Sequence, residues 1–208
     1  MSDRLRILLV GASGVLGKAI AAELSPRHEI ISAGSKTGDI RIDITDPASI
    51  EKALKAAGRL DAVASAAGAV NFHPLSAIKP ARLAESSYGL GLANKVMGQV
   101  NLALAARDHL DDRGSITLMA GVLSQTPIAY GSSASMVNAA IEAFAMAAAI
   151  EMPRGIRINA VSPTVVEESM KDFGPFFRGH DPVPALRVGR AFSRSIEGLE
   201  TGKTYRVV

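Results

Sequence analysis

A glycine-rich turn near the start of the chain constrains its fold more than any other feature. An apolar strand pattern ending in Leu-Leu-Val runs directly into three glycines spaced by three, and an apolar helix pattern follows. Such a unit leaves free backbone N–H groups at the positive end of a helix dipole, where a phosphate can bind. Gly11 would allow the tight turn, and Gly14 would let a pyrophosphate approach the backbone. Gly17 would let the helix pack closely on the strand. The turn predicts a dinucleotide site, although three glycines alone are more often a simple tight turn.

Length and composition predict a single globular domain over residues 1–208. Of the 208 residues, 48% are hydrophobic and 21% are charged, which is ordinary for a soluble protein. The absence of cysteine excludes disulfides, thiolate metal sites and cysteine nucleophiles. No apolar run approaches the roughly 20 residues that span a bilayer. The few residues before the first strand leave no room for a signal peptide. We therefore expect a cytoplasmic protein that does not bind membranes.

The charge pattern argues against nucleic acid as a partner. The formal net charge is +3, and the lysines and arginines are scattered rather than clustered. Nucleic-acid surfaces combine a basic patch with aromatic side chains, whereas aromatics make up only 4% of this chain. No pair of its histidines has the spacing of metal ligands, so we expect no metal. A mildly basic domain also suits a phosphorylated cofactor.

Strand and helix patterns alternate along the whole chain, which predicts an α/β fold with a doubly wound parallel sheet of about seven strands and helices on both faces. The expected strands are Arg6–Val10, Glu29–Ala33, Ile40–Ile42, Ala62–Ala66, Ser115–Met119, Arg157–Ala160 and Thr204–Val207. The expected helices are Val15–Leu24, Pro47–Ala57, a long one near Leu83–Leu110, Ser132–Glu151 and Pro184–Ile196. Asp46 followed by Pro47 predicts a capped helix start. Ligands of such sheets bind beyond the carboxyl ends of the strands, so the motifs there should converge on one cleft.

Three further motifs resemble those of the short-chain dehydrogenase/reductase family. Residues 155–163 (Gly-Ile-Arg-Ile-Asn-Ala-Val-Ser-Pro) are similar to its sixth-strand signature, and residues 61–68 resemble its fourth-strand Asp-x-Leu-Val-Asn-Asn-Ala-Gly. Residues 43–46 match the family's Asp-Val-Thr-Asp, whose first Asp lies near the adenine. With the glycine turn, these motifs occur in family order over essentially the whole chain. The resemblance implies a Rossmann-like fold and hydride transfer between a nicotinamide cofactor and a small carbonyl or alcohol.

The end of the second strand favours NADP over NAD. NAD-binding proteins place an acid there for the ribose 2′-hydroxyl, whereas residues 33–36 (Ala-Gly-Ser-Lys) offer none. Lys36 can meet a 2′-phosphate and Ser35 can hydrogen-bond it; the alternative is an exposed lysine in a turn. The complete set of predicted cofactor residues is Gly11, Ser13, Gly14, Val15, Leu16, Gly17, Ser35, Lys36, Asp43, Ile44, Ala66, Ala67, Gly68, Pro163 and Val165.

The catalytic residues that the resemblance implies are missing. The family uses a serine, a tyrosine acid and a lysine, whose positions fall here on Gly121, Ala134 and Asn138. The intervals of 13 and 4 residues between these positions match the family's spacing. The asparagine of the family's long helix corresponds to Lys95. Because the changes cluster at the chemistry and spare the nucleotide half, they indicate a changed or lost reaction.

Tyr130 and Lys95 are the residues predicted to rebuild a proton donor. Tyr130 lies four residues before Ala134, one turn earlier if the helix begins there. Lys95, from the neighbouring helix, would lower the pKa of a nearby tyrosine because its charge favours the phenolate. Alternatively, Tyr130 only lines the cleft and Lys95 lies on a solvated helix face.

Other polar and aromatic residues near the expected cleft have two interpretations each. Ser124, Ser132 and Ser133 can polarise a carbonyl, although Ser132 fits a helix N-cap better. His73 is the one histidine expected to face the cleft, but a proline beside it favours a rigid turn. The aromatic segment 173–177 falls where the family has its mobile lid; it can cover a substrate, pack under a loop or contact another subunit.

Two classes of function remain open at this point. One is an NADP(H)-dependent oxidoreductase with a small-molecule substrate, and the other is a catalytically silent NADP(H)-binding sensor or regulatory protein. The helices expected near 83–110 and 132–151 are rich in Ala and Gly, which permits close helix contact. The resemblance places a dimer interface on these helices, so we expect a homodimer or homotetramer.

Overall fold

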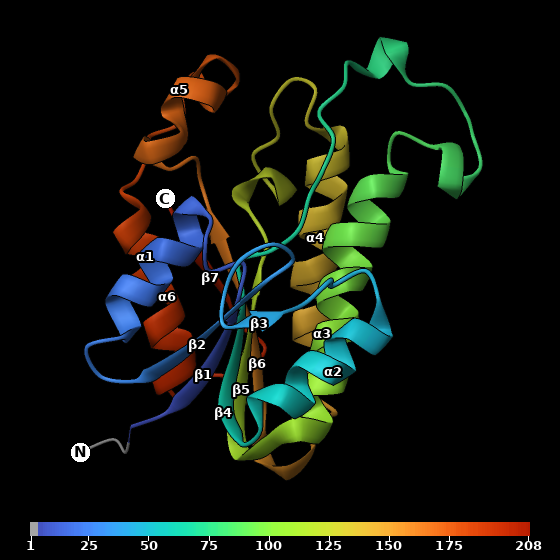
Figure 1. Ribbon diagram of the computed structural model, residues 1–208. Coiled ribbons are helices and arrows are strands. Elements are labelled where there is room, and N and C mark those ends of the chain that lie inside the picture. Colours follow the sequence, from blue (N-terminus) through green and yellow to red (C-terminus); the bar gives the residue numbers. More distant parts are fainter. Residues whose placement is uncertain (1–3) are drawn as a thin grey trace.

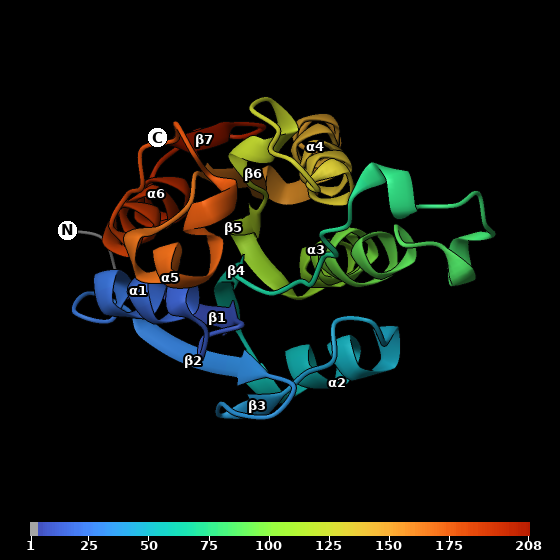
Figure 2. The ribbon, with the colours of Figure 1, turned by 90° about the horizontal axis from the view of Figure 1, so that it is seen from above.

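The alternating segments pair, as predicted, into one parallel seven-stranded sheet with helices on both faces (Figures 1 and 2). The structure is a computed structural model that describes residues 4–208; residues 1–3, on which the expectation of no signal peptide partly rests, lie outside it. The strand order is β3-β2-β1-β4-β5-β6-β7. This order reverses between β1 and β4, which creates the crevice where ligands of such sheets bind. The strands are β1 (Arg6–Val10), β2 (Glu29–Gly34), β3 (Ile40–Arg41), β4 (Leu60–Ser65), β5 (Leu110–Met119), β6 (Arg157–Pro163) and β7 (Thr204–Val207).

Two apolar layers hold the helices against the sheet. Figure 2 shows α1 and α6 on one face and α2, α3 and α4 on the other. Helix α6 buries Val188, Phe192 and Ile196, one from each successive turn, so one stripe of the helix faces the sheet. On the opposite face, Leu102 and Ile141 pack in a second core. The helices are α1 (Val15–Leu24), α2 (Pro47–Ala57), α3 (Met97–His109), α4 (Ser132–Ala148), the short α5 (Met170–Phe173) and α6 (Ala185–Glu197).

The long helix predicted near 83–110 is present but begins six residues late, at residue 89, and its start is irregular. Residues Leu83–Glu85 form a single 3₁₀ turn, and a π-helix over Gly91–Val96 precedes α3. Gly89 begins the helical segment, at a point where a Cβ would lie 2.4 Å from the carbonyl oxygen of Leu83. A second glycine two residues later further lowers the helix propensity of this segment. The π-helix matters because it carries Lys95, and such irregular turns frequently occur at functional sites.

The two predicted helix starts differ in outcome. The prediction for Asp46 is confirmed, since its carboxylate accepts a hydrogen bond of 2.9 Å from the backbone N–H of Ala48. The prediction of Ser132 as an N-cap is wrong, because Gly131 occupies that position. The Ser132 hydroxyl is instead 3.1 Å from the hydroxyl of Tyr88 and joins α4 to the segment before α3. Helix α4 ends at Ala148, slightly before the predicted end.

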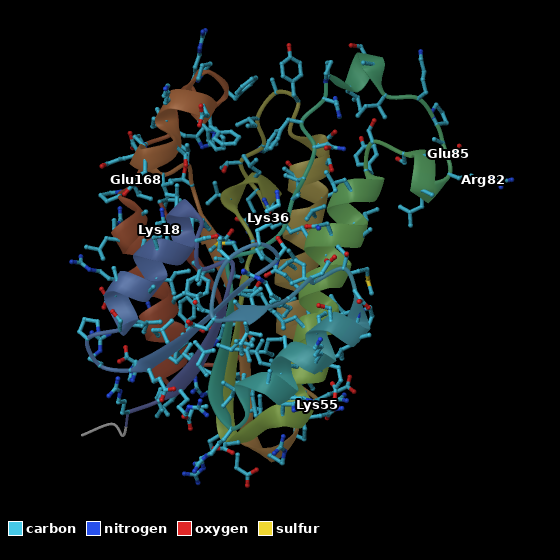
Figure 3. All side chains as sticks on the ribbon, in the orientation of Figure 1. Lys18, Lys36, Lys55, Arg82, Glu85 and Glu168 are labelled. Carbon is cyan, nitrogen blue, oxygen red and sulfur yellow. The ribbon has the colours of Figure 1, made fainter. Side chains whose placement is uncertain are left out.

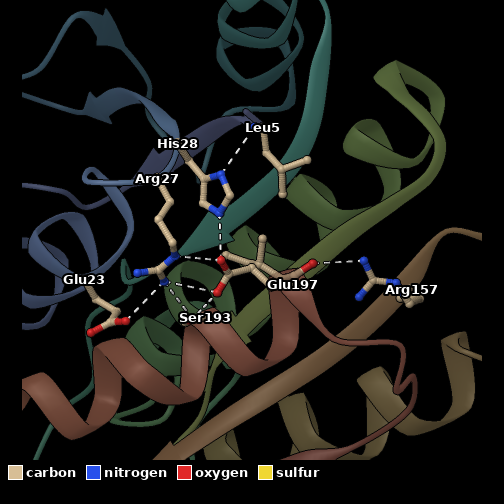
Figure 4. A network of polar contacts seen from close by, with 8 residues as sticks. Leu5, Glu23, Arg27, His28, Arg157, Ser193 and Glu197 are labelled. Atoms are coloured by element: carbon tan, nitrogen blue, oxygen red, sulfur yellow. Dashed lines mark hydrogen bonds and ion pairs between the residues drawn. The ribbon is translucent and has the colours of Figure 1, made fainter. Parts of the chain in front are cut away.

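A polar network joins the turn before β2 to α6, at the amino ends of the strands and away from the crevice (Figure 4). Arg27 donates to both carboxylate oxygens of Glu197, at 2.9 and 3.2 Å. His28 is 3% exposed and contacts Glu197 through Nε2 at 2.9 Å. Its Nδ1 accepts from the backbone N–H of Leu5, so Nε2 is the donor to Glu197. Arg27, with help from Ser193 and His28, lowers the pKa of Glu197 to about 2.

The Glu197→Gln variant is expected to lose stability that depends on pH. A carboxylate with a lowered pKa stabilises the folded state above its ordinary pKa, and this contribution disappears as the pH falls toward the folded value. The two proteins should therefore differ by about 1 kcal/mol at pH 7, as for a solvent-accessible ion pair. The difference should shrink as the pH falls below the ordinary pKa of a glutamate and vanish only below about pH 2. Urea unfolding at several pH values measures this. A difference that stays constant with pH would contradict it, and Glu85→Gln, at an exposed acid, is the control.

Among residues 4–208, no helix is both long and apolar enough to cross a membrane.

Candidate functional site

The carboxyl ends of β1, β2 and β4 enclose a groove of about 580 Å³ at the crevice. Eight of the fifteen residues predicted to bind the cofactor line it, and the first turn of α1 adjoins it at Ser13. Pro163 and Val165 lie instead at the end of β6. The lining residues are Val10, Gly11, Ser13, Gly34, Ser35, Lys36, Thr37, Ile42, Asp43, Ile44, Thr45, Ala67, Gly68, Ala69 and Asn94.

Two of the three turn glycines are required by the packing of the chain itself. Gly11 has a φ of +84°, and a Cβ there would lie 2.9 Å from the backbone of Ala66. A Cβ on Gly17 would lie 2.1 Å from the carbonyl oxygen of Gly11. By contrast, a Cβ on Gly14 would meet only that oxygen, at 3.6 Å. The space at Gly14 is therefore open within the chain, which fits a ligand that approaches the backbone.

The start of α1 has the properties of an anion site. Its N-cap is Gly14, which offers no side chain to the free N–H groups, and its first turn carries no acid. These N–H groups and the helix dipole attract a phosphate. Lys18 is exposed on the same turn (Figure 3). The residues present thus fit the pyrophosphate of a dinucleotide.

The opposite end of the groove holds one fixed carboxylate. Asp43 Oδ1 accepts from the backbone N–H and the hydroxyl of Thr45, at 2.9 and 2.7 Å, and these bonds lower the pKa of Asp43. Asp39, beyond the end of β2, instead binds the N–H and hydroxyl of Ser32 and does not line the groove. The lining residues beside the β2 end are Ser35, an exposed Lys36 and a threonine.

Asn94 is a groove residue that the sequence analysis missed. Its Oδ1 accepts a hydrogen bond of 2.7 Å from the backbone N–H of Ala69, which fixes the loop after β4 to the π-helix. The bond joins residues 25 positions apart. No local motif marks this asparagine, so only the tertiary structure reveals it.

Lys95 and Asn138 contact each other beside this groove. The Lys95 Nζ donates to Asn138 Oδ1 at 2.7 Å and to the carbonyl oxygen of Ala120 at 3.1 Å. Partial burial lowers the pKa of Lys95 to about 8. The resemblance implies an asparagine at 95 and a lysine at 138, so the two residue types have exchanged positions across one hydrogen bond.

Two glycines leave room for this pair. A Cβ on Gly121 would lie 2.7 Å from Asn138 Nδ2, so a serine at this position would collide with the asparagine. A Cβ on Gly68 would lie 2.6 Å from Cγ of Lys95, whose stem therefore packs against the backbone that lines the groove. The missing family serine is thus linked to the presence of Asn138.

Tyr130 lies away from the hydrogen bonds of Lys95. Its ring is 48% exposed and meets Phe176 edge-on, with the ring centroids 6.0 Å apart. Its carbonyl oxygen accepts from the backbone N–H of His73, whose side chain is exposed. Within residues 4–208, no hydrogen bond joins Tyr130 to Lys95. A shared role for the two remains a prediction.

The aromatic segment after β6 covers the loops that follow β4 and β5. Phe173 meets Phe72 with ring centroids 6.0 Å apart, and Phe176 meets Tyr130. Phe177 is buried in a small apolar cluster with Leu123, Ala134 and Val165. This cluster is a buried apolar layer, against which the partly buried Phe72 and Ile128 of the loops after β4 and β5 pack.

The three candidate serines have different surroundings. Ser124 donates to Glu142 Oε1 at 2.8 Å, and Ser162 donates to the same oxygen at 2.7 Å. Ser132 pairs with a tyrosine hydroxyl, as described above. In the part of the chain that the structure describes, the buried Ser133 hydroxyl has no hydrogen-bond partner. Over the same residues, no group of three or more His, Asp or Glu side chains is placed to hold a metal ion.

Comparison with known proteins places this site in a family. A family model described as enoyl-(acyl carrier protein) reductase matches residues 11–182, and no curated protein sequence matches the chain. The crystal structure of lin1944 from Listeria innocua shares 46% sequence identity over 98% of this chain and 100% of its own, with a TM-score of 0.93. A small-chain dehydrogenase in complex with NADPH shares 24% identity over 99% of this chain and 97% of its own, with a TM-score of 0.83. A short-chain type dehydrogenase/reductase from Mycobacterium ulcerans shares 18% sequence identity over 100% of this chain and 90% of its own, with a TM-score of 0.80. The chain therefore belongs to the short-chain dehydrogenase/reductase family of NAD(P)-dependent oxidoreductases.

Proposed function

We propose that this protein binds NADP(H) in the groove and transfers a hydride between the cofactor and a small carbonyl or alcohol. The observation that carries the proposal is the groove itself. It joins an open anion site at Gly14 to a β2 end that presents Lys36 in place of an acid. A structural relative with 24% identity was solved in complex with NADPH, which supports the same cofactor here.

Each part of the groove has a role in this proposal. The N–H groups after Gly14 would bind the pyrophosphate, and the fixed carboxylate of Asp43 would accept from the adenine amino group. Lys36 and Ser35 would bind the 2′-phosphate by charge-assisted hydrogen bonds. When bound, the cofactor supplies or accepts the hydride. The apolar segment 173–177 would exclude water from the substrate.

Replacing Lys36 with alanine is expected to weaken NADPH binding about tenfold and leave NADH binding unchanged. A charge-assisted hydrogen bond to a phosphate contributes about 1.5–3 kcal/mol, and NADH lacks that phosphate. Titration of nucleotide fluorescence measures both affinities. Lys55→Ala, on α2 outside the groove (Figure 3), is the control that should change neither. Equal affinity for the two nucleotides in the unaltered protein would contradict the choice of NADP.

The second candidate function is a silent NADP(H) sensor. It is favoured by the residues Gly121, Ala134 and Asn138 at the family's catalytic positions. A panel of aldehydes, ketones and quinones with NADPH separates the two functions. Turnover of any of them supports the enzyme, whereas tight NADPH binding without turnover supports the sensor.

The Tyr130–Lys95 proton donor is tested by Tyr130→Phe, which removes only the hydroxyl. If this tyrosine is the acid, turnover should fall about a hundredfold or more, as for loss of a general acid. Turnover equal to that of the unaltered protein would exclude this role.

A homodimer or homotetramer built on α3 and α4 is also part of the proposal. These helices leave Met97, Leu104 and Met146 exposed, and Ile150 just after α4 is also exposed. An association between copies would cover these side chains. Light scattering coupled to gel filtration measures the mass in solution.

A further inference from the structure

We propose that Lys95, positioned by Asn138, is the residue that donates the proton to the substrate oxygen. The proposal rests on the proposed hydride transfer and names the acid that this transfer requires. It assigns Lys95 a direct role in place of the tuning of Tyr130.

The surroundings of Lys95 are unusual for a partly buried cation. Its two acceptors, Asn138 Oδ1 and the Ala120 carbonyl oxygen, are both neutral. Within residues 4–208, no carboxylate lies at salt-bridge distance from its Nζ. Removing a charge from water without a counter-charge costs free energy. The placement of Lys95 therefore lowers the stability of the fold unless another interaction offsets that cost. An ammonium carries three N–H bonds, and these two acceptors leave one for another partner.

Lys95 also lies between the nucleotide groove and the buried apolar cluster of Leu123, Ala134, Val165 and Phe177. Its stem packs against Gly68 in the groove wall, and the preceding residue, Asn94, lines the groove. Its partner Asn138 lies one helical turn after Ala134, a member of the apolar cluster. A substrate bound at this end of the groove would therefore place its oxygen near the Lys95 Nζ.

Asn138 has the properties of a positioning residue. Only 4% of it is exposed, and its Oδ1 accepts the shorter of the two Lys95 hydrogen bonds. A neutral amide holds the ammonium in place but does not stabilise its charge as a carboxylate would. The lowered pKa of Lys95, about 8, is consistent with an amine that can both give and regain a proton near neutral pH.

The proton balance of the step is simple. As the hydride forms a new C–H bond at the carbonyl carbon, the π electrons of the C=O bond move to the oxygen. A Lys95 N–H bond breaks and its proton forms the new O–H bond, which leaves a neutral amine. Water returns a proton to the amine, and the oxidation of an alcohol uses these steps in reverse. The hydride comes from the nicotinamide cofactor of the proposed function.

The groups around Lys95 determine how its protonation responds to pH. Helix α4 presents Asn138, the end of β5 presents the Ala120 carbonyl, and the loop after β4 presents the backbone of Gly68. The acid one turn further along α4, Glu142, is bound by Ser124 and Ser162. In the part of the chain that the structure describes, neither hydrogen bond of Lys95 is to a titratable side chain.

Lys95→Met tests the proposal directly, because methionine keeps the length of the stem and removes the acid. Turnover should fall about 100- to 10,000-fold, the usual contribution of a general acid, whereas the NADPH dissociation constant should stay within about twofold. The matched Lys55→Met, on α2 outside the groove, should keep its turnover. A Lys95→Met protein that is folded and fully active would overturn the proposal, as would loss of turnover in Tyr130→Phe alone.

A second readout does not depend on activity. Acetylation of the Lys95 amine, followed by mass spectrometry over a range of pH, should have its midpoint near pH 8, and in Asn138→Asp the midpoint should rise because an anion stabilises the ammonium. A midpoint near 10.4, the value for an ordinary lysine, would overturn the proposal. Failure of the proposed function has a different signature. In that case the unaltered protein shows no turnover on any carbonyl compound, whatever the labelling midpoint.

Discussion

Replacing Gly17 with alanine is expected to destabilise the protein by about 3 kcal/mol or more. Overpacking typically costs 1–3 kcal/mol and more where the obstacle is rigid. Here the added methyl would lie 2.1 Å from the Gly11 carbonyl oxygen and 2.7 Å from Cα of Ala12. Both obstacles are backbone, so no side-chain rotation relieves them. Because most domains are stable by only about 5–15 kcal/mol, urea or thermal unfolding should show a large shift of the midpoint.

Gly14→Ala is the matched control within the same turn. Its added methyl would meet only one atom, at 3.6 Å, and its φ of −73° suits any residue. This variant should retain nearly all of its stability but bind NADPH at least about tenfold more weakly, because the methyl occupies the approach of the pyrophosphate. If Gly14→Ala bound NADPH normally, the phosphate site would not lie at this turn. If Gly17→Ala were as stable as the unaltered protein, the close packing of α1 on the turn would be contradicted.

Gly121→Ser, which restores the family's serine, should reduce turnover at least about tenfold rather than increase it. The serine Cβ would lie 2.7 Å from Asn138 Nδ2, so the asparagine must move and its hydrogen bond to Lys95 is strained or lost. Displacing a buried side chain also costs about 1–3 kcal/mol of stability. Parallel measurements of turnover, NADPH affinity and unfolding separate loss of the pair from general destabilisation.

Asn138→Ala provides the second arm of this test. The smaller side chain frees the space that the serine needs, so the double variant should be destabilised less than the sum of the single variants. Residues in contact commonly show such coupling. Simple additivity would contradict the collision between Gly121→Ser and Asn138. A Gly121→Ser protein with increased turnover would mean that Lys95 and Asn138 do not carry the chemistry.

Most of the fold could be predicted from the sequence because its signals are local. Short apolar strands such as Arg6–Val10, the Asp46–Pro47 helix start and the glycine turn each depend on a few neighbouring residues. All seven predicted strands are present, although β5 begins at Leu110 rather than at residue 115. The main error is the start of the long helix predicted near 83–110, which begins at residue 89 and opens with a π-helix.

The residues of the nucleotide groove could be predicted from the sequence more fully than the contacts of Lys95 and Asn94 beside it. The groove residues follow directly on strand ends, and the carboxyl ends of parallel strands necessarily meet at one edge. The Lys95–Asn138 contact joins residues 43 positions apart, and the contact of Asn94 with Ala69 joins residues 25 apart. Neither lies within a local motif.

The sequence by itself determined that the chain forms a doubly wound sheet with a glycine turn, and that the family's serine, tyrosine and lysine are absent. The tertiary structure decided what occupies their place. Nothing in the order of residues indicates that Lys95 reaches Asn138, or that Gly121 is the space Asn138 requires. Helix and strand patterns report interactions over a few residues, whereas a side chain on a π-helix meets its partner only once the helices have packed.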